Sequence, residues 1–594
     1  MIRNYLKIAL RNLWKSKGYT TINIVGLSVA FTIAVFLFLT AYFLITFDSF
    51  HKDKDRIFQT YIFSNDPEKV SNNGGMPIPL APILKAEYPE IEGAARIFQG
   101  RKILVEYKGK YFDENICMTD PDFLNIFSFP MIKGNRKTSL NDLDDIVISE
   151  KMAKAVFGKD EPIGKQIQVG NGDNKKPYIV SGLISDNPSN STIRYDALIR
   201  IENMSSYAQD KDNWGAYNHS VFIKLNPKEN QETFEKRIRT FAPKYFPQGL
   251  SELKNKGAKA DPKGDILALR LLKLTDLHFD MEITGKGTPI AVVYTLIGIA
   301  VFILFIACIN FINLNIARSF SRAKEIGVRK SLGALKNQLF FQIWGESIII
   351  CLSGFLLGIM LAYSLLPKFN AVFDAKIDLG FLIQPGFILI MVSVFIIVTF
   401  MAGGYPAMKM TKFNAIEVLK GKVSVKGSSG LRNSLIITQF SMSTLLICCT
   451  VIAFQQINYL RTRPLGFEKE EVISIPVGNV VNGQQALQRM RNKLANDPTI
   501  VSISGSGLNL GKGKDRVTAR SVVGLEYKGR QVSTDWVSID YDYLKTLNIK
   551  LLAGREFNPA YASDSLDRVI ITESMAKALG EKDPVGKTFR SGEE

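Results

Sequence analysis

Five long uncharged runs constrain the fold of this 594-residue chain more than any other feature. Each run reaches the roughly 20 residues that a helix needs to cross the hydrocarbon core of a bilayer. Buried helices of a soluble protein would rarely include five such runs, so we predict an integral membrane protein with five transmembrane helices. The runs lie at residues 22–47, 290–309, 347–367, 386–408 and 433–457.

The first run is expected to remain in the chain as an anchor. It is longer than the roughly 7–15 apolar residues of a signal-peptide core, and no small-residue cleavage site follows it. Before it, Leu6, Leu10, Leu13 and Trp14 share one face of a predicted helix whose other faces carry cations. Such a helix suits the surface of an anionic membrane. A plain charged flank explains the same residues equally well.

The net charge of +18 is explained by membrane topology. Basic residues cluster in segments 1–19, 318–337 and 409–432, whereas segment 368–385 balances two lysines with two aspartates. The clusters fall at alternate ends of the apolar runs, as the positive-inside rule requires. We therefore predict a multi-pass membrane protein with a cytoplasmic N-terminus and large domains outside the membrane. No nucleic-acid partner is predicted.

The apolar runs and the charges together predict how the chain is divided. The expected segments are a cytoplasmic amphipathic helix (1–19), transmembrane helix 1 (20–47), external core domain 1 (48–288), transmembrane helix 2 (289–317), a basic cytoplasmic segment (318–339), transmembrane helix 3 (340–367), a short external loop (368–385), transmembrane helix 4 (386–408), a cytoplasmic loop (409–432), transmembrane helix 5 (433–457) and an incomplete external core domain 2 (458–594).

The two external regions are expected to be α+β core domains that fold without disulfide bonds. Only Cys117 of the five cysteines lies outside the apolar runs. Stretches 177–184 and 519–537 are rich in strand-forming residues, and short helices are expected over 149–157 and 572–579. The predicted fold class is an α-helical integral membrane protein with five transmembrane helices and α+β core domains outside the membrane.

An internal repeat relates the two external regions. "VISEKMAKAVFGKDEPIGKQI" at 147–167 reappears as "IITESMAKALGEKDPVGKTF" at 570–589, and residues 122–134 parallel residues 542–554. The first copy continues for more than a hundred residues beyond the repeat, but the second stops soon after it. Because a module cut in mid-core cannot bury its apolar face, we expect this chain to be a piece that lacks three further spans.

No motif for catalysis or cofactor binding is found. The tripeptide Gly586-Lys587-Thr588 resembles the end of a phosphate-binding loop, but the required glycine is replaced by Glu581. The histidines, His51, His219 and His278, show no metal-ligand spacing. We predict no cofactor, no metal and no enzymatic activity in this chain.

Several residues in the runs or directly beside them are notable. Glu346, at the start of the third run, is a candidate functional acid or a carboxylate paired with cations of the preceding loop. Asn310 and Asn313 are placed to hydrogen-bond a neighbouring helix or lipid headgroups. Gly354 and Gly358 form a small-xxx-small pair that permits close helix packing. "AGGYPA" at 402–407 should break or kink the fourth span.

Several segments, in the correct order, resemble FtsX/MacB-type ABC transporter permeases in the long tandem form of Bacteroidota-like bacteria. This resemblance implies four-helix permease halves, each with a periplasmic core domain between its first two helices, so that this chain comprises one complete four-helix permease half and the start of a second. It further implies a protein of the cell inner membrane whose two external core domains lie in the periplasm. Since the sequence contains no Walker motif, it also implies that a separate dimeric ABC ATPase supplies the energy. The segments that carry the resemblance are 6–30, 47–58, 180–199, 318–347, 405–422 and 431–467.

By this resemblance, the segment between spans two and three couples the permease to the ATPase. Its apolar Ile326, Val328 and Leu332 are expected to enter a groove of the partner, and Gly327 and Gly333 favour a short, bent element over a long rod. A basic loop that only sets topology is the alternative interpretation. The coupling residues carried over are Arg322, Lys324, Glu325, Ile326, Gly327, Val328, Arg329, Lys330, Gly333 and Ala334.

The resemblance implies a permease subunit in which ATP hydrolysis by the partner drives periplasmic motions that export a peptide, lipoprotein, drug or lipid. Further implied partners are a membrane-fusion-type periplasmic protein and membrane lipids. The alternative function is an FtsX-like signalling or scaffold protein, which regulates an envelope enzyme or senses an envelope ligand without transport.

Overall fold

The computed structural model places most of the chain in two compact units. One comprises residues 1–101, 115–166 and 178–452, and the other comprises residues 102–114, 167–177 and 453–594. Most of the expected loop 409–432 lies outside the residues that the structure describes. These are 2–67, 69–170, 175–283, 287–373, 375–411, 429–477, 481–508, 522–528 and 530–591.

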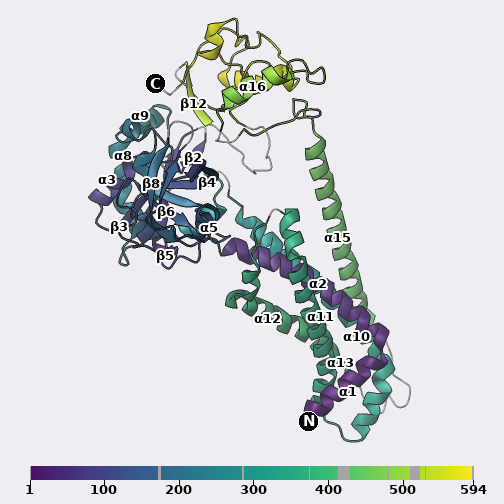
Figure 1. Cartoon of the computed structure of the whole chain (residues 1–594). Coiled ribbons are helices and arrows are strands. Elements are labelled where there is room, and N and C mark those ends of the chain that lie inside the picture. The colour runs from purple at the N-terminus through teal and green to yellow at the C-terminus, as the bar shows by residue number, and fades with distance from the viewer. Residues whose placement is uncertain are drawn as a thin grey trace. The chain divides into compact units, whose positions relative to one another are not determined.

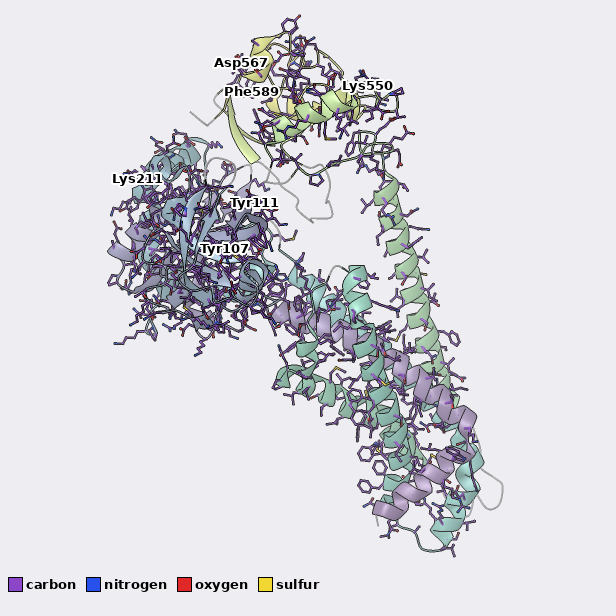
Figure 2. All side chains as sticks on the ribbon, in the orientation of Figure 1. Tyr107, Tyr111, Lys211, Lys550, Asp567 and Phe589 are labelled. Carbon is purple, nitrogen blue, oxygen red and sulfur yellow. The ribbon has the colours of Figure 1, made fainter. Side chains whose placement is uncertain are left out.

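Among the described residues, five helices are long and apolar enough to cross a membrane, which confirms the predicted number (Figure 1). Helix α11 continues beyond the expected end at residue 367 to Phe373 and includes Pro367. The candidate spans are Lys17–Ile45 (α2), Ile290–Ala317 within α10 (Ile290–Ser331), Lys336–Phe373 (α11), Pro385–Met410 and Asn433–Thr462 within α15 (Ser429–Thr462). The described residues of α15 include no buried side chain. Figure 2 shows side chains of α15 pointing away from the helix.

The fourth span is interrupted where the glycine–proline sequence predicted it. Helix α12 (Pro385–Thr399) leads into a π-helical turn, Phe400–Gly404, which is followed by α13 (Tyr405–Met410). A side chain at Gly403 would collide with Ser347 of α11. The interruption is therefore a widened turn that brings the backbone close to α11, and not a break in the span.

Close packing of α2 against α11 organises the helices of the first unit. Gly354 and Gly358 face α2, and the Thr32 hydroxyl donates to the carbonyl of Gly358 at 3.2 Å. Aromatic contacts between Phe31 and Phe355 and between Phe36 and Phe369 extend the interface. The small-xxx-small pair thus permits the close approach that was predicted from its spacing.

The first unit also contains most of an α+β domain built on a mixed sheet. The strand order along its main path is β11-β1-β10-β3-β4-β9-β6-β8-β5, with parallel pairing of β4 with β9 and of β6 with β8. The strands are β1 (Ile57–Asn65), β3 (Ile91–Tyr107), β4 (Lys110–Thr119), β5 (Met131–Lys133), β6 (Asp145–Ser149), β8 (Lys176–Ile184), β9 (Ala197–Arg200), β10 (Ser220–Leu225) and β11 (Leu267–Lys273); β2 (Val70–Asn73) pairs with β1, and β7 (Gln166–Val169) pairs with β3.

Alternating side chains of the central strands build a core on each face of this sheet. In β10, Val221, Ile223 and Leu225 join one apolar cluster, and Phe222 joins the other. This alternation follows from the two-residue period of a strand. The first cluster is covered by α3 (Leu80–Glu87), α7 (Gln231–Arg237), α8 (Phe241–Tyr245) and α9 (Pro247–Asn255); the second contains Phe123, Phe127, Phe129 and Tyr195.

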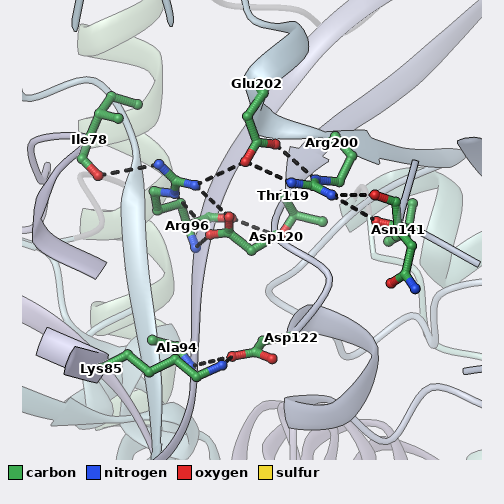
Figure 3. A network of polar contacts seen from close by, with 11 residues as sticks. Ile78, Lys85, Ala94, Arg96, Thr119, Asp120, Asp122, Asn141, Arg200 and Glu202 are labelled. Atoms are coloured by element: carbon green, nitrogen blue, oxygen red, sulfur yellow. Dashed lines mark hydrogen bonds and ion pairs between the residues drawn. The ribbon is translucent and has the colours of Figure 1, made fainter. Parts of the chain in front are cut away.

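A buried ionic network ties β3 to β4 and β9 (Figure 3). Arg96 is 5% exposed and forms a two-point contact with Asp120, from Nε at 2.9 Å and from the terminal amino group at 2.6 Å. Glu202 lies 3.5 Å from Arg96 and accepts two 2.9 Å bonds from Arg200. Burial lowers the pKa of Arg96, but Asp120 outweighs it and leaves the pKa above its usual value.

The described part of the second unit repeats local structure of the α+β domain. Ser149 caps α5 (Glu150–Phe157) and Thr572 caps α18 (Glu573–Leu579), each by accepting the amide of the third residue onward. The glycines of the repeat adopt positive φ in both copies: 94° and 84° at Gly134 and Gly554, 64° and 72° at Gly158 and Gly580, and 77° and 79° at Gly164 and Gly586. Strands β12 (Val522–Tyr527), β13 (Arg530–Asp535) and β14 (Arg590–Ser591) form a separate sheet there.

Candidate functional site

The turn between α10 and α11 is the best-defined feature within the predicted coupling segment. Helix α10 runs unbroken to Ser331, and Gly333 follows with φ +92°. The amide of Gly333 donates to the carbonyl of Lys330 at 3.0 Å, and that of Ala334 donates to the carbonyl of Arg329 at 3.1 Å. This pair of bonds is a Schellman C-cap, which requires a left-handed residue and therefore favours glycine.

An apolar cluster anchors this turn to the neighbouring helices. Ile326 is 4% exposed and packs with Leu339 and Ile343 of α11 and with Ala407 and Met410 of α13. The cluster links the end of α10 to both the third and the fourth spans. A displacement of the turn would therefore move these helices together.

Polar contacts reinforce the same anchor. Lys330 donates from Nζ to the carbonyl of Thr411 at 2.7 Å. Arg329 donates to Oε1 of Gln342 at 2.7 Å and forms an ion pair with Glu325 at 2.7 Å. Partial burial, with Lys336 nearby, lowers the pKa of Lys330 below its usual value. The cations of the turn thus hold the helices together in addition to setting charge.

Three apolar side chains remain uncovered on this anchored turn. Val328 is 46% exposed, Leu332 is 82% exposed and Leu335 is 65% exposed. They lie on the last turn of α10 and on the connection to α11. A rigid turn that presents uncovered apolar side chains beside cations has the chemistry of a protein-docking surface. We call Val328, Leu332 and Leu335 the exposed tip.

Two expectations about the coupling segment are wrong. The segment is not a short, bent element, because α10 continues through Gly327 and bends only at Gly333, where the left-handed glycine ends the helix. Ile326 does not face outward, because α11 and α13 bury it. Gly327 is also buried and Ala334 is half-buried, whereas Glu325 is exposed. The side chains of Arg322 and Lys324 lie outside the described residues.

Glu346 connects the third span to the N-terminal helix α1 (Ile2–Lys15). Its side chain is 5% exposed, and Nδ2 of Asn12 donates to its Oε1 at 2.8 Å. Leu13 packs into the core of the helices, whereas Leu10 and Trp14 are 58% and 75% exposed. The predicted apolar face of α1 is thus divided, because α1 packs against α11. Asn12, a polar residue without a motif around it, gave no signal in the sequence.

Asn310 and Asn313, the two asparagines of α10 that the sequence singled out, lie near different neighbours. Nδ2 of Asn313 donates to Oε1 of Gln439 on α15 at 3.5 Å. Asn310 is exposed and lines a groove of about 230 Å³ between α2 and α10, with Gly26, Ala30 and Ala307 among its other lining residues. The nearby Asn315, which accepts from the Tyr19 hydroxyl at 2.6 Å, was not singled out from the sequence.

Side chains that could bind a metal ion are dispersed over the described residues. Within those residues, no group of three or more His, Cys, Asp or Glu side chains is placed to hold a metal ion. His51 and His219 are each buried, whereas His278 is half-buried. His51 accepts the amide of Ser128 through Nδ1 at 3.0 Å, and His219 contacts Asn218 at 2.8 Å. Burial lowers the pKa of His51 to about 4 and that of His219 to about 3.

Comparison with known proteins gives two family matches in succession. A family described as "MacB-like periplasmic core domain" matches residues 20–241, and a family described as "FtsX-like permease C-terminal" matches residues 297–415. The first match covers α2 and most of the α+β domain. The second covers α10 to α13 and therefore includes the exposed tip.

Curated relatives match this chain at low sequence identity. The chain is 22% identical over 275 residues to "Macrolide export ATP-binding/permease protein MacB" of Bdellovibrio bacteriovorus, covering 46% of this chain and 38% of the relative. It is 24% identical over 343 residues to "Uncharacterized ABC transporter permease YknZ" of Bacillus subtilis, covering 57% of this chain and 72% of the relative. The chain therefore spans well under half the length of that MacB.

A search of solved structures also finds the periplasmic region of MacB from Actinobacillus actinomycetemcomitans. The two are 17% identical with a TM-score of 0.25, and the match covers 37% of this chain and 89% of that one.

Proposed function

The chain belongs to the FtsX/MacB-type ABC transporter permeases, and from this we propose that it is the membrane subunit of a transporter driven by a separate ATPase. Five candidate spans and MacB-like periplasmic domain homology make it a multi-pass membrane protein with periplasmic domains. We place the N-terminus and the α10–α11 turn in the cytoplasm, on the charge distribution of the sequence.

The exposed tip is the observation that carries this proposal. An ATPase that moves a membrane protein needs a surface on which it can act, and apolar side chains beside fixed cations supply one. Leu332, at 82% exposure, projects from a turn held by the Schellman cap and by the cluster around Ile326. Movement imposed at Leu332 therefore passes to α11 and α13.

In this proposal the partner binds and hydrolyses ATP, because the sequence of this chain contains no G-x-x-x-x-G-K-[ST] motif. The MacB of Bdellovibrio bacteriovorus carries "ATP-binding/permease" in its own name, and this chain corresponds to part of its length. ATP-driven motion of the helices would act on the periplasmic domains and expel a substrate there. Peptides, lipoproteins, drugs and lipids are the substrate classes that the proposal allows.

A double substitution at the tip tests the docking role. Val328→Asp with Leu332→Asp replaces both apolar contacts by charge while leaving the buried Ile326 cluster intact. Because two interface hot spots contribute at least about 2 kcal/mol each, co-purification of the ATPase should fall by more than about 100-fold. The measurements are pull-down of the full-length protein with mass spectrometry, and ATP hydrolysis by the purified complex.

The matched control is Leu143→Asp, because Leu143 is 55% exposed but lies in the α+β domain. This variant should retain the ATPase subunit. Normal membrane insertion of the tip variant, with lost ATPase binding, supports the proposal. An unchanged yield and rate for the tip variant contradict it.

A further inference from the structure

The end of α2 is tied to the α+β domain by a set of interlocking bonds. Nδ2 of Asn190 donates to the carbonyl of Thr46 at 2.7 Å, and the amide of Asp48 donates to the carbonyl of Asn190 at 2.9 Å. In return, Oδ1 of Asp48 accepts the amide of Thr192 at 2.9 Å and the hydroxyl of Ser191 at 3.3 Å. Loop 190–192 is thus hydrogen-bonded to Thr46 and to Asp48, on either side of Phe47, directly after the span.

Asp48 adopts a left-handed backbone conformation, which its hydrogen bonds to loop 190–192 hold in place. It has φ +52°, in the left-handed region that costs an aspartate about 1–2 kcal/mol, and its side chain is fully buried. A carboxylate is rarely buried to this degree without partners. Its three bonds to loop 190–192, together with the bond from Asn190 to Thr46, over-determine the backbone at the exit from the span.

A ring stack joins the other membrane connections to the same place. Phe47 stacks on His278 with ring centroids 3.6 Å apart and planes at 12°. His278 lies in the 3-10 helix Leu274–Phe279, and its carbonyl accepts the amide of Thr288, two residues before α10 begins. Phe43, one turn before Phe47 on α2, packs at 5.3 Å on Phe381 of the segment Leu379–Ile383 that links α11 to α12.

We propose that Thr46, Phe47, Asp48, Asn190–Thr192 and His278, together called the exit joint, form a rigid coupling that passes displacement of the membrane helices to the α+β domain. Asn190 and Asp48 are its positioning residues. The idea that this displacement is driven by ATP rests on the proposed function, but the rigidity of the joint does not. A mere covalent connection would need none of these bonds, since residues 46–50 and 280–289 already join the parts.

The rigidity is tested on the full chain in nanodiscs without nucleotide. Spin labels are placed at Val25→Cys on α2 and at Lys211→Cys on the α+β domain, both exposed, after replacing the exposed Cys448 and Cys449 by serine. Pulsed electron paramagnetic resonance then gives the distribution of distances between the labels. Asn190→Ala removes one net bond of about 1 kcal/mol, so the population of displaced conformations should rise about fivefold.

His278→Ala removes the ring stack and is the second variant, which leaves the bonds of Asn190 in place. The control is Thr119→Ala, which removes a 2.8 Å bond to the carbonyl of Arg96 from a fully buried hydroxyl elsewhere in the α+β domain. A broader distribution for Asn190→Ala and His278→Ala, but not for Thr119→Ala, is expected. An Asn190→Ala distribution as narrow as the wild type, or an equal broadening by Thr119→Ala, overturns the proposal.

Adding the ATPase subunit and ATP distinguishes a failure of the exit joint from a failure of the proposed function. ATP should shift the label distance in the wild-type complex, and Asn190→Ala should reduce this shift while the rate of ATP hydrolysis is unchanged. A joint that is rigid without nucleotide, in a wild-type complex where ATP produces no shift, supports the joint and contradicts the transporter function. A full ATP-driven shift in Asn190→Ala overturns the coupling role of the joint.

Discussion

Gly358 of α11 lies against Phe31 of α2 so closely that a methyl group on Gly358 would stand 2.7 Å from Cβ of Phe31. At Gly354, one turn earlier, the added methyl would stand 2.9 Å from Cβ of Leu27. Both distances are shorter than any comfortable carbon–carbon contact. The absence of a side chain at these positions therefore sets the separation of α2 and α11.

Alanine at these glycines should separate the two helices. Gly354→Ala and Gly358→Ala are each expected to destabilise the protein by about 1–3 kcal/mol, because the packed helices must move apart. Thermal unfolding of the full chain in detergent measures the loss. Gly345→Ala is the matched control on α11, since a methyl group there meets nothing within 4 Å. Equal unfolding temperatures for Gly345→Ala and Gly358→Ala would contradict the interpretation.

Replacing Arg96 should be among the most damaging changes in the α+β domain. Arg96→Met leaves Asp120, whose side chain is 14% exposed, without its two-point partner. Removing one member of a buried pair costs about 3–5 kcal/mol. Lys236→Ala removes an exposed pair with Glu232, where the side chains are 73% and 81% exposed, and should cost under about 0.5 kcal/mol. Denaturant unfolding, monitored by hydrogen exchange in β3 and β4, measures the loss of stability in Arg96→Met and in Lys236→Ala.

The Schellman cap predicts a selective effect at Gly333. Gly333→Ala forces alanine into φ +92° and should cost about 1–2 kcal/mol locally, although the added methyl group meets no neighbour. The turn should rearrange, and ATPase stimulation should fall while the α+β domain keeps its stability. Gly298→Ala, in open space within α10, is the control and should leave stimulation unchanged. Normal stimulation by Gly333→Ala would show that the geometry of the turn is unimportant.

The burial of Asp48 predicts that the stability of the folded protein falls as the pH rises. Burial raises the pKa of Asp48 from 3.8 to about 6, despite the opposing hydrogen bonds from Thr192 and Ser191 and the nearby Arg194. A pKa raised in the folded state gives stability that is complete below pH 4 and is lost as the pH rises through 6. At neutral pH the ionised carboxylate therefore costs at most about 3 kcal/mol.

Asp48→Asn should remove this cost. The difference in unfolding temperature, variant minus wild type, should increase between pH 4.5 and 7.5, which lie on either side of the folded-state pKa of about 6. His51, whose pKa is lowered to about 4 by burial, destabilises the folded state as the pH falls below 6.5, but both proteins contain it and its effect cancels. A difference that is the same at both pH values would refute the assignment to Asp48.

The membrane architecture could be predicted because it depends on local properties. Whether residues 347–367 can span a bilayer depends on their own length and polarity, and the structure bears this out in α11. The repeat was likewise visible in the letters, and its glycines prove to share positive φ in both copies. The glycine pair at 354 and 358 indicated close packing, but not that α2 would be the partner.

The burial of individual residues in the coupling segment could not be predicted from the sequence. Ile326 and Val328 are both apolar and two residues apart, and nothing in their local sequence distinguishes them. The structure buries Ile326 under α11 and α13 and leaves Val328 46% exposed. Which of two neighbouring apolar residues faces outward depends on which helices return to cover it.

The sequence by itself determined the five spans, their charge pattern, the internal repeat and the absence of a phosphate-binding motif. Only the tertiary structure decided the strand order of the sheet, the burial of Ile326 and the meeting of Asp48 with Asn190 and of Phe47 with His278. Those pairs are separated by more than a hundred residues along the chain. Periodicity, length and charge act within a segment, whereas such contacts form only when the whole fold brings distant segments together.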